Sequence, residues 1–275
     1  SSAFTSARII VASAPPLTAL SLRFLVSGLI GVLIALALGQ SWRLTRAQWR
    51  ATIIFGICQN ALYLGLNFVA MQTIEASLAA IIASTMPLLV GLASWALLGE
   101  RIGLLGGLGL VAGVIGVAVI MGSRLQGGAD LYGLALCVGG VLALTLATLT
   151  VRGATSGGNF LMIVGLQMLV GSLVLGVAGL SIETIRIDWS WQLVAAFLYT
   201  TLIPGLAATL VWFKLVNRIG AIKAATFHFL NPFFGVVIAA LILSESLGVW
   251  DMVGVVVVMI GILAVQLSRQ KQASG

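Results

Sequence analysis

The chain has 275 residues, of which 60% are hydrophobic and 8% are charged, and its mean hydropathy is +1.18. A soluble domain carries about 25% charged residues, so this composition excludes a soluble globular protein and predicts an all-α polytopic membrane protein. The net charge of +7 does not indicate a nucleic-acid partner, because clustered Lys and Arg in a membrane protein report the orientation of its loops.

Apolar segments long enough to cross a bilayer, about 20 residues each, follow one another along nearly the whole chain. The first 14 residues, before Pro15 and Pro16, are too few to span it, so we expect the chain to begin inside its first helix. Nine more transmembrane helices are expected, at about residues 17–39, 48–71, 76–98, 102–122, 130–151, 159–180, 190–214, 220–243 and 247–268. A polar tail, 269–275, follows the last of them.

An internal repeat organises these helices. Residues 86–121 and 231–266 align without a gap at an offset of 145, and the shared positions include Pro87/Pro232, Glu100/Glu245, Gly103/Gly248, Gly109/Gly254 and Gly116/Gly261. Ten helices and this offset predict two units of five, residues 1–122 and 130–268. Because five is odd, the second unit enters the membrane from the opposite side, which is the inverted-repeat architecture of many secondary transporters.

The charges of the connecting loops support this count. Alternate loops and the tail carry ten Lys or Arg residues against the single acid Glu100, whereas the other loops carry two basic and six acidic residues. Positively charged loops stay in the cytoplasm. The sequence therefore predicts that both termini are cytoplasmic.

Three stretches of the chain resemble the drug/metabolite transporter superfamily, in its branch with ten helices and two five-helix repeats. They are PPLTALSLRF at the second helix, MPLLVGLASWALLGERI, and its repeat partner NPFFGVVIAALILSESL. The resemblance covers nearly the whole chain and is greatest to bacterial inner-membrane exporters of aromatic amino acids. It implies a basket-like bundle around a central cavity, with the fifth and tenth helices at its periphery.

Polar side chains at membrane depth usually face the bundle interior. The third helix carries Asn60, Tyr63 and Asn67 at a spacing that places them on one helix face, together with the nearby Gln59. We interpret this face as the lining of a substrate cavity. The alternative is packing, because Asn and Gln also form hydrogen bonds between helices.

The only histidine, His228, lies near the middle of the ninth helix, three residues before Asn231. The repeat places Ala83 at the equivalent position, so the scaffold does not require a histidine there. We predict that His228 and Asn231 contribute to the site, with Tyr199 and Trp212 of the eighth helix as aromatic candidates. A histidine satisfied within the protein core is the alternative.

Three prolines are expected inside helices, namely Pro87, Pro232 and Pro204. An interior proline removes a backbone hydrogen bond and kinks a helix, so each can serve as a hinge or as a fixed bend. We interpret Glu100 and Glu245 as caps of the fifth and tenth helices.

Two arginines, Arg8 and Arg23, lie within expected helices. Each can extend toward the membrane surface, or attract a carboxylate of the substrate. Cys58 and Cys137 lie in apolar runs and are interpreted as core residues, without a disulfide or metal site.

No phosphate-binding loop, paired carboxylates or metal-ligand cluster is evident in the sequence, so we expect neither ATP hydrolysis, nor a cofactor, nor enzymatic activity. The expected function is export of small neutral or zwitterionic metabolites, chiefly aromatic or other bulky apolar amino acids. Because no acid is expected at mid-membrane, transport is predicted to follow the substrate gradient by alternating access. Proton antiport through His228, a membrane enzyme using His228 as base, and a channel are the alternatives.

Overall fold

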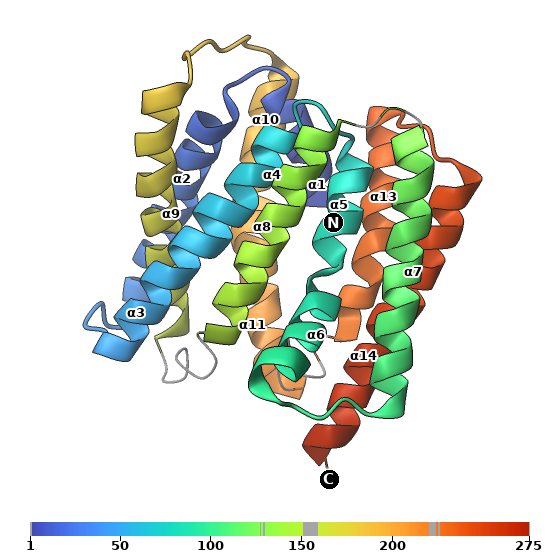
Figure 1. Cartoon of the computed structure of the whole chain (residues 1–275). Helices are drawn as coiled ribbons and strands as arrows, with labels where there is room; N and C mark the ends of the chain where they lie inside the picture. The colour runs from blue at the N-terminus through green and yellow to red at the C-terminus, as the bar shows by residue number, and fades with distance from the viewer. Residues whose placement is uncertain are drawn as a thin grey trace.

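The structure is a computed structural model that describes residues 2–126, 128, 130–150, 159–219, 224 and 226–274. Within these residues it is all-helical and contains no strand (Figure 1). The segments are α1 (Ser2–Val11), α2 (Pro16–Ala37), α3 (Arg46–Phe55), η1 (Gly56–Tyr63), α4 (Leu64–Ala70), α5 (Ala76–Ser84), α6 (Met86–Leu98), α7 (Leu104–Gln126), α8 (Leu131–Thr150), α9 (Phe160–Ile182), α10 (Trp191–Thr200), η2 (Thr201–Ala207), α11 (Ala208–Ile219), η3 (Phe227–Leu230), α13 (Asn231–Leu243) and α14 (Val249–Ser274).

Seven helical stretches of the described chain are long and apolar enough to cross a membrane. They are Pro16–Ala37, Arg46–Ala70, Ala76–Leu97, Leu104–Arg124, Leu131–Leu149, Phe160–Ile182 and Val249–Gln272. Three further apolar helices are shorter: Ser2–Val11, Trp191–Ala207 and Phe227–Leu243. The prediction of an all-helical polytopic membrane protein is therefore confirmed.

Several expected helices are not regular along their length. Two contain a π-helical segment, η1 between α3 and α4 and η2 between α10 and α11. A third is broken at Thr85, where α5 ends and α6 begins. Pro87 and Pro232, which were expected inside helices, lie within the stretches Ala76–Leu97 and Phe227–Leu243, where each stands in the first turn of a new segment, α6 or α13. There the missing N–H has no helical partner to lose. Pro204 does lie inside a helix, in η2.

The segment bounds recur along the chain at the offset of the sequence repeat. Adding 145 to the bounds of α6 gives 231–243, which are the bounds of α13, and adding it to those of α3 gives 191–200, which are the bounds of α10. The same shift carries η1 onto 201–208, one residue longer than η2. Both α6 and α13 end at a residue with positive φ, Gly99 at 64° and Ser244 at 54°. The irregular turns are thus repeated together with the regular ones.

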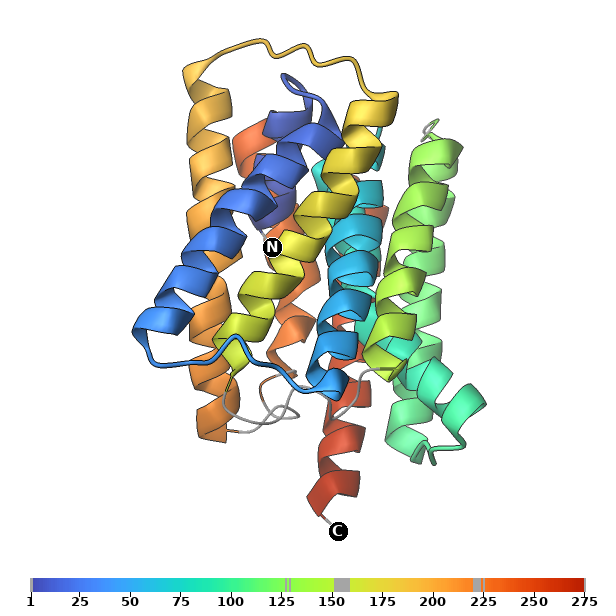
Figure 2. The same ribbon diagram turned by 90° about the vertical axis from the view of Figure 1, so that its left-hand side faces the viewer.

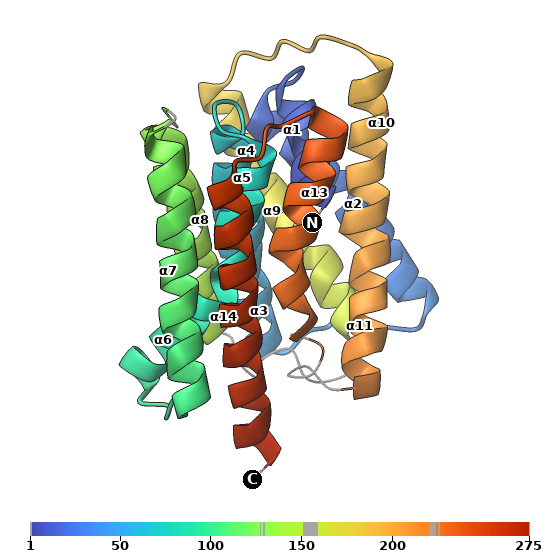
Figure 3. The same cartoon turned by 90° about the vertical axis from the view of Figure 1, so that its right-hand side faces the viewer.

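Two pairs of long helices make close contacts between the first and second halves of the chain. Helices α7 and α14 run side by side in Figures 1 and 3, and α2 and α9 do so in Figures 1 and 2. Small residues let the backbones approach, as is usual between membrane helices. In the second pair, the hydroxyl of Ser21 donates to the carbonyl oxygen of Ser172 and that of Ser172 donates back to Ser21, each at 2.8 Å.

Connections alternate between the two ends of the bundle. In Figure 1, those after α9 and α13 lie at the top, whereas those after α2 and α6, and the C-terminus, lie at the bottom. At the upper end, helix starts are capped by distant carboxylates. Glu183 accepts from the backbone N–H groups of Leu17 and Thr18 at the start of α2, at 2.8 and 2.9 Å.

Glu245 caps a different helix from the one expected. Its carboxylate accepts from the backbone N–H groups of Ala76 and Ser77, at 2.7 and 3.0 Å, and so caps α5. The start of α14 is capped by Asp251, whose carboxylate accepts a hydrogen bond from the N–H of Gly248 at 3.0 Å. The expected cap of the tenth helix is therefore corrected.

An ion-pair cluster joins three helix ends near this cap. Arg124, near the end of α7, pairs with Glu75 before α5 and, at 3.0 Å, with Asp251 in the first turn of α14. These contacts tie α7 to both α5 and α14 at the upper end of the bundle.

Candidate functional site

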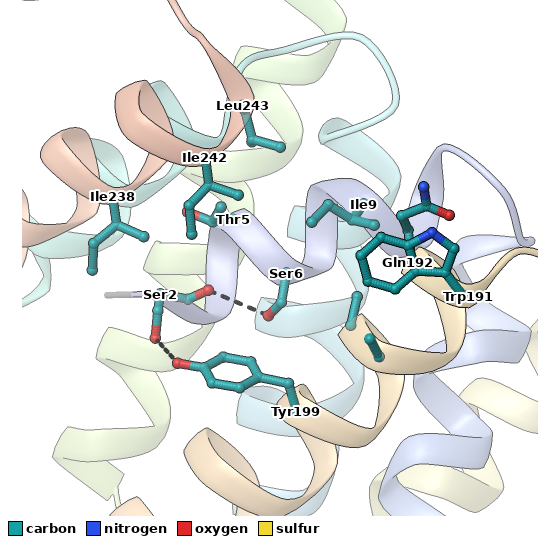
Figure 4. A pocket seen from close by; sticks show the side chains of 12 residues that line it. Ser2, Thr5, Ser6, Ile9, Trp191, Gln192, Tyr199, Ile238, Ile242 and Leu243 are labelled. Carbon is teal, nitrogen blue, oxygen red and sulfur yellow. Dashed lines mark hydrogen bonds between the residues drawn. The ribbon is translucent and has the colours of Figure 1, made fainter.

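A cavity of about 810 Å³, here called the inner chamber, lies between α1, α10 and α13 (Figure 4). Its lining includes Ser2, Thr5, Ser6 and Ile9 of α1, Trp191, Gln192 and Tyr199 of α10, and Ile238, Ile242 and Leu243 of α13. None of the described residues that line it is charged. One wall thus carries hydroxyl, amide and indole groups, and the α13 wall is aliphatic.

Hydrogen bonds organise the polar wall of the inner chamber. The hydroxyl groups of Ser2 and Tyr199 lie 2.7 Å apart and join α1 to α10. One turn away, the hydroxyl of Thr200 donates to that of Ser6 at 2.6 Å. The Thr5 hydroxyl is buried and has no hydrogen-bond partner among the described residues. A buried hydroxyl without a partner is uncommon. The Thr5 hydroxyl is therefore available to form a hydrogen bond with a ligand in the cavity.

A second cavity, the outer chamber, of about 750 Å³, adjoins the first. Ile9, Gln192 and Leu243 line both chambers, so the two chambers are neighbours. The outer chamber reaches the connections at the upper end of the bundle and is lined by charged and polar residues that include Arg8, Gln72, Glu75, Gln192, Ser244 and Glu245. A ligand held across both chambers would meet charged groups at one end and apolar groups at the other.

Among the predicted site residues, Tyr199 lines the inner chamber. The two asparagines of the third helix contact neighbouring helices instead. The Asn60 amide donates to the carbonyl oxygen of Gln167 on α9 at 2.9 Å. Asn67, fully buried, donates to the Tyr63 carbonyl oxygen at 2.7 Å and accepts from the Cys137 thiol of α8 at 3.2 Å. These contacts match the packing alternative.

Three other predicted site residues, Tyr63, His228 and Asn231, line neither chamber. Tyr63 is partly buried and packs against the main hydrophobic core. In η3 and the start of α13, the His228 Nδ1 and the Asn231 side-chain amide are 3.0 Å apart. Trp212 belongs to α11, but its side chain lies outside the described part of the structure.

Sequence reasoning missed most of the chamber lining. Ser2, Thr5 and Ser6 belong to the short first helix, for which no polar face was predicted. Their spacing of three and four residues puts the hydroxyls on one side of a helix, and this signal was present in the sequence.

Arg23 does not reach the membrane surface, as snorkelling requires. The residue is 6% exposed, and its guanidinium lies 5.0 Å from the ring centroid of Phe24. Arg23 lines neither chamber, whereas Arg8 lines the outer one. Burial of this α2 side chain therefore corrects the expected outward extension.

The fold defines a polytopic helical membrane protein. The family model of the EamA-like transporter family matches residues 1–122 and 131–267, so the chain belongs to this family. The family lies in the drug/metabolite transporter superfamily, which confirms the resemblance at that level.

Relatives in other organisms agree with the family. The chain is 28% identical over 263 residues to the uncharacterized transporter YvbV of Bacillus subtilis, covering 95% of this chain and 86% of the relative. It is 25% identical to the protein PecM of Dickeya dadantii, covering 98% of this chain and 90% of PecM. A crystal structure of a protein 18% identical superposes with a TM-score of 0.67 over 98% of this chain and 96% of that one, which shows a shared fold.

Proposed function

We propose that this transporter exports small neutral or zwitterionic metabolites, with aromatic or other bulky apolar amino acids as the main substrates. The inner chamber is the observation that supports this most directly. Its volume of about 810 Å³ lies within the range of small-molecule sites, about 300–1,000 Å³. An uncharged lining with one polar and one aliphatic wall suits an amphipathic ligand better than a polyanion or a metal ion.

In this proposal, ten helices form two inverted five-helix units, residues 1–122 and 130–268, that alternate access to the substrate. The repeated segment bounds support the two units, as do the contacts of α7 with α14 and of α2 with α9 between the two halves of the chain. The three shorter apolar helices supply the spans needed beyond the seven long ones. The basic loops support a location in the inner membrane with both termini in the cytoplasm.

The proposed substrate pathway combines the inner chamber with the predicted residues that lie elsewhere. Tyr199 contacts the substrate in the present arrangement, and Tyr63, Asn60, Asn67, His228, Asn231 and Trp212 line the pathway in other stages of transport. Pro87, Pro232 and Pro204 are the proposed hinges. The break at Thr85 and the π-helical turn around Pro204 support a hinge role, because irregular turns bend more readily than regular helix.

Uptake into liposomes tests the proposed function. Purified protein is reconstituted, and entry of radiolabelled phenylalanine, tyrosine, tryptophan, leucine, alanine and glutamate is compared with entry into protein-free liposomes. We expect the bulky apolar amino acids to enter fastest and glutamate not to enter. If none of these amino acids enters faster than into protein-free liposomes, or if glutamate enters fastest, the proposal is contradicted.

Cysteine labelling tests the ten-helix topology. Single cysteines replace Trp42 and Ile185, which are 64% and 58% exposed, in a background where Cys58 and Cys137 are Ala. A membrane-impermeant maleimide should label the two positions from opposite sides of the membrane. Labelling of both from the same side would exclude the proposed arrangement.

A further inference from the structure

The two chambers differ in the chemistry of their walls, and the difference gives a bound ligand a direction. Charged residues line the outer chamber, and the described lining of the inner chamber has none. An amphipathic ligand is most stable with its charged groups in the outer chamber and its apolar part in the inner one, because burying an unpaired charge is costly.

Arg8 is the cation at the boundary. On α1 it follows Thr5 and Ser6, which line the inner chamber, and precedes Val11, which lines the outer one. Ile9, its neighbour, lines both. A group bound to Arg8 therefore lies within reach of the inner chamber.

The hydrogen-bonding capacity of Arg8 is mostly unused by the protein. Among the described residues, its guanidinium donates to the carbonyl oxygen of Met71 and forms no ion pair, although Glu75 and Glu245 line the same chamber. A guanidinium carries five N–H donors. The two acids have other partners, since Glu75 pairs with Arg124 and Glu245 caps α5.

Neither Arg124 nor Arg23 presents a guanidinium without a carboxylate partner to one of the chambers. Arg124 is held between Glu75 and Asp251. Arg23, on α2, is buried and lines neither chamber, although its Nε has no hydrogen-bond partner among the described residues. Arg8 is thus the guanidinium that lines a chamber without a carboxylate partner in the described chain.

We propose that Arg8 binds the carboxylate of the transported molecule and so orients it, with its apolar side chain in the inner chamber. A guanidinium matches a carboxylate with two parallel hydrogen bonds, and such bonds are about twice as strong as neutral ones. The inference rests on the proposed function for the identity of the substrate, but it requires only that the ligand carries a carboxylate and an apolar group.

Binding is tested first, by the rise in melting temperature of the detergent-solubilised protein. The probes are phenylalanine, 3-phenylpropionate, which lacks the ammonium group, and phenylalanine amide, which lacks the carboxylate. We expect the first two to stabilise the parent protein and the amide to do so at about tenfold or higher concentration. If the amide stabilises the parent as well as phenylalanine does, Arg8 does not select a carboxylate.

Three variants then locate the selectivity. Arg8→Gln keeps a donor for the Met71 carbonyl oxygen but loses the charge, and should need about tenfold to a hundredfold more 3-phenylpropionate for the same stabilisation. Arg8→Lys should restore part of the loss. Arg186→Gln removes an exposed charge at the same end, from a residue that lines neither chamber, and should bind like the parent.

Uptake into liposomes separates this inference from the proposed function. If the parent takes up phenylalanine and Arg8→Gln does so with unchanged rate and selectivity, the role of Arg8 is refuted and the proposed function stands. If no amino acid is taken up but 3-phenylpropionate stabilises the parent and not Arg8→Gln, the amino-acid proposal fails and the role of Arg8 stands. If no carboxylate stabilises the folded parent, the role of Arg8 is refuted.

Discussion

Gly109 of α7 and Gly261 of α14 approach each other so closely that neither position has room for a side chain. A Cβ atom at Gly109 would lie 2.8 Å from the carbonyl oxygen of Gly261, and one at Gly261 would lie 2.7 Å from that of Gly109. Gly116 and Gly254 repeat the arrangement, at 2.9 and 2.8 Å. Since the repeat pairs Gly109 with Gly254 and Gly116 with Gly261, each contact is the image of the other. Such reciprocity is expected around a two-fold axis.

Replacing Gly109 or Gly261 by Ala should therefore destabilise the protein. The added methyl group meets backbone atoms, which cannot move as a side-chain end can, so we expect a loss of about 1–3 kcal/mol. Thermal unfolding in detergent measures it. Gly107→Ala, also on α7, is the matched control, because a Cβ atom there would meet nothing within 4 Å. This variant should have the melting temperature of the parent or a slightly higher one. Equal melting temperatures for all variants would contradict the packing argument.

Removing the Glu183 carboxylate should weaken the start of α2. The variant Glu183→Ala loses two bonds from backbone N–H groups and a third, at 2.8 Å, from the Thr18 hydroxyl. Loss of a helix cap costs about 0.5–2 kcal/mol. The same unfolding measurement should show a lower melting temperature for this variant, with Thr184→Ala as the neighbouring control. An unchanged melting temperature would mean that the cap adds nothing to stability.

Asp130 should give a pH-dependent contribution to stability. Hydrogen bonds from the Thr73 hydroxyl and the N–H groups of Gly133 and Tyr132 lower the pKa of its carboxyl below the ordinary 3.8. A carboxyl with a lowered pKa stabilises the folded state above its unfolded pKa, and this is lost as the pH falls through the folded pKa. The parent should therefore melt slightly above Asp130→Asn at pH 7, and the gap should close below about pH 4. A gap that widens in acid would reverse the sign of the pKa shift.

Filling the inner chamber should block transport without unfolding the protein. Ile238 lines the chamber on α13, whereas Leu241 of the same helix is 79% exposed. Uptake of radiolabelled phenylalanine by Ile238→Trp should fall to the level of protein-free liposomes. Leu241→Trp adds the same bulk on the outside and should keep the parental rate. Parental uptake by Ile238→Trp would remove the inner chamber from the pathway.

Transport should need no ion gradient. All seven acids of the chain lie in connections or near helix ends, which leaves no carboxylate at mid-membrane to carry protons. In liposomes with equal pH on both sides, phenylalanine should equilibrate, and an imposed pH gradient should not drive accumulation. Accumulation that follows the pH gradient and vanishes in His228→Ala would instead establish proton antiport through His228.

The sequence predicted the features that depend on composition and local pattern. Long apolar segments gave the helical membrane class, and the motif spacings around Pro87 and Pro232 gave the transporter superfamily. The all-helical membrane class is confirmed, because a bilayer admits only helices or closed barrels as spanning structures. The superfamily is confirmed by the family match.

Contacts between distant residues could not be predicted in the same way. Glu245 caps α5, whose first residue is 169 positions away, and nothing near Glu245 specifies that partner. The π-helical turns also escaped, because apolar residues on both sides of a membrane helix conceal a shift in periodicity. Asn60 and Asn67 were expected on one face of a regular helix, yet Asn60 lies within η1 and Asn67 follows it in α4, and they contact α9 and α8.

The two π-helical segments have different mechanical properties, although they occupy equivalent positions. Pro204 in η2 has no N–H, so rewinding that turn into regular α-helix recovers no hydrogen bond at this residue. The equivalent residue of η1 is Gln59, whose N–H can donate in either geometry. One residue of α-helix corresponds to about 100° of rotation. Rewinding η1 would therefore rotate α4 about its own axis against α8. Rewinding into regular α-helix is therefore easier for η1 in the first half of the chain than for η2 in the second half.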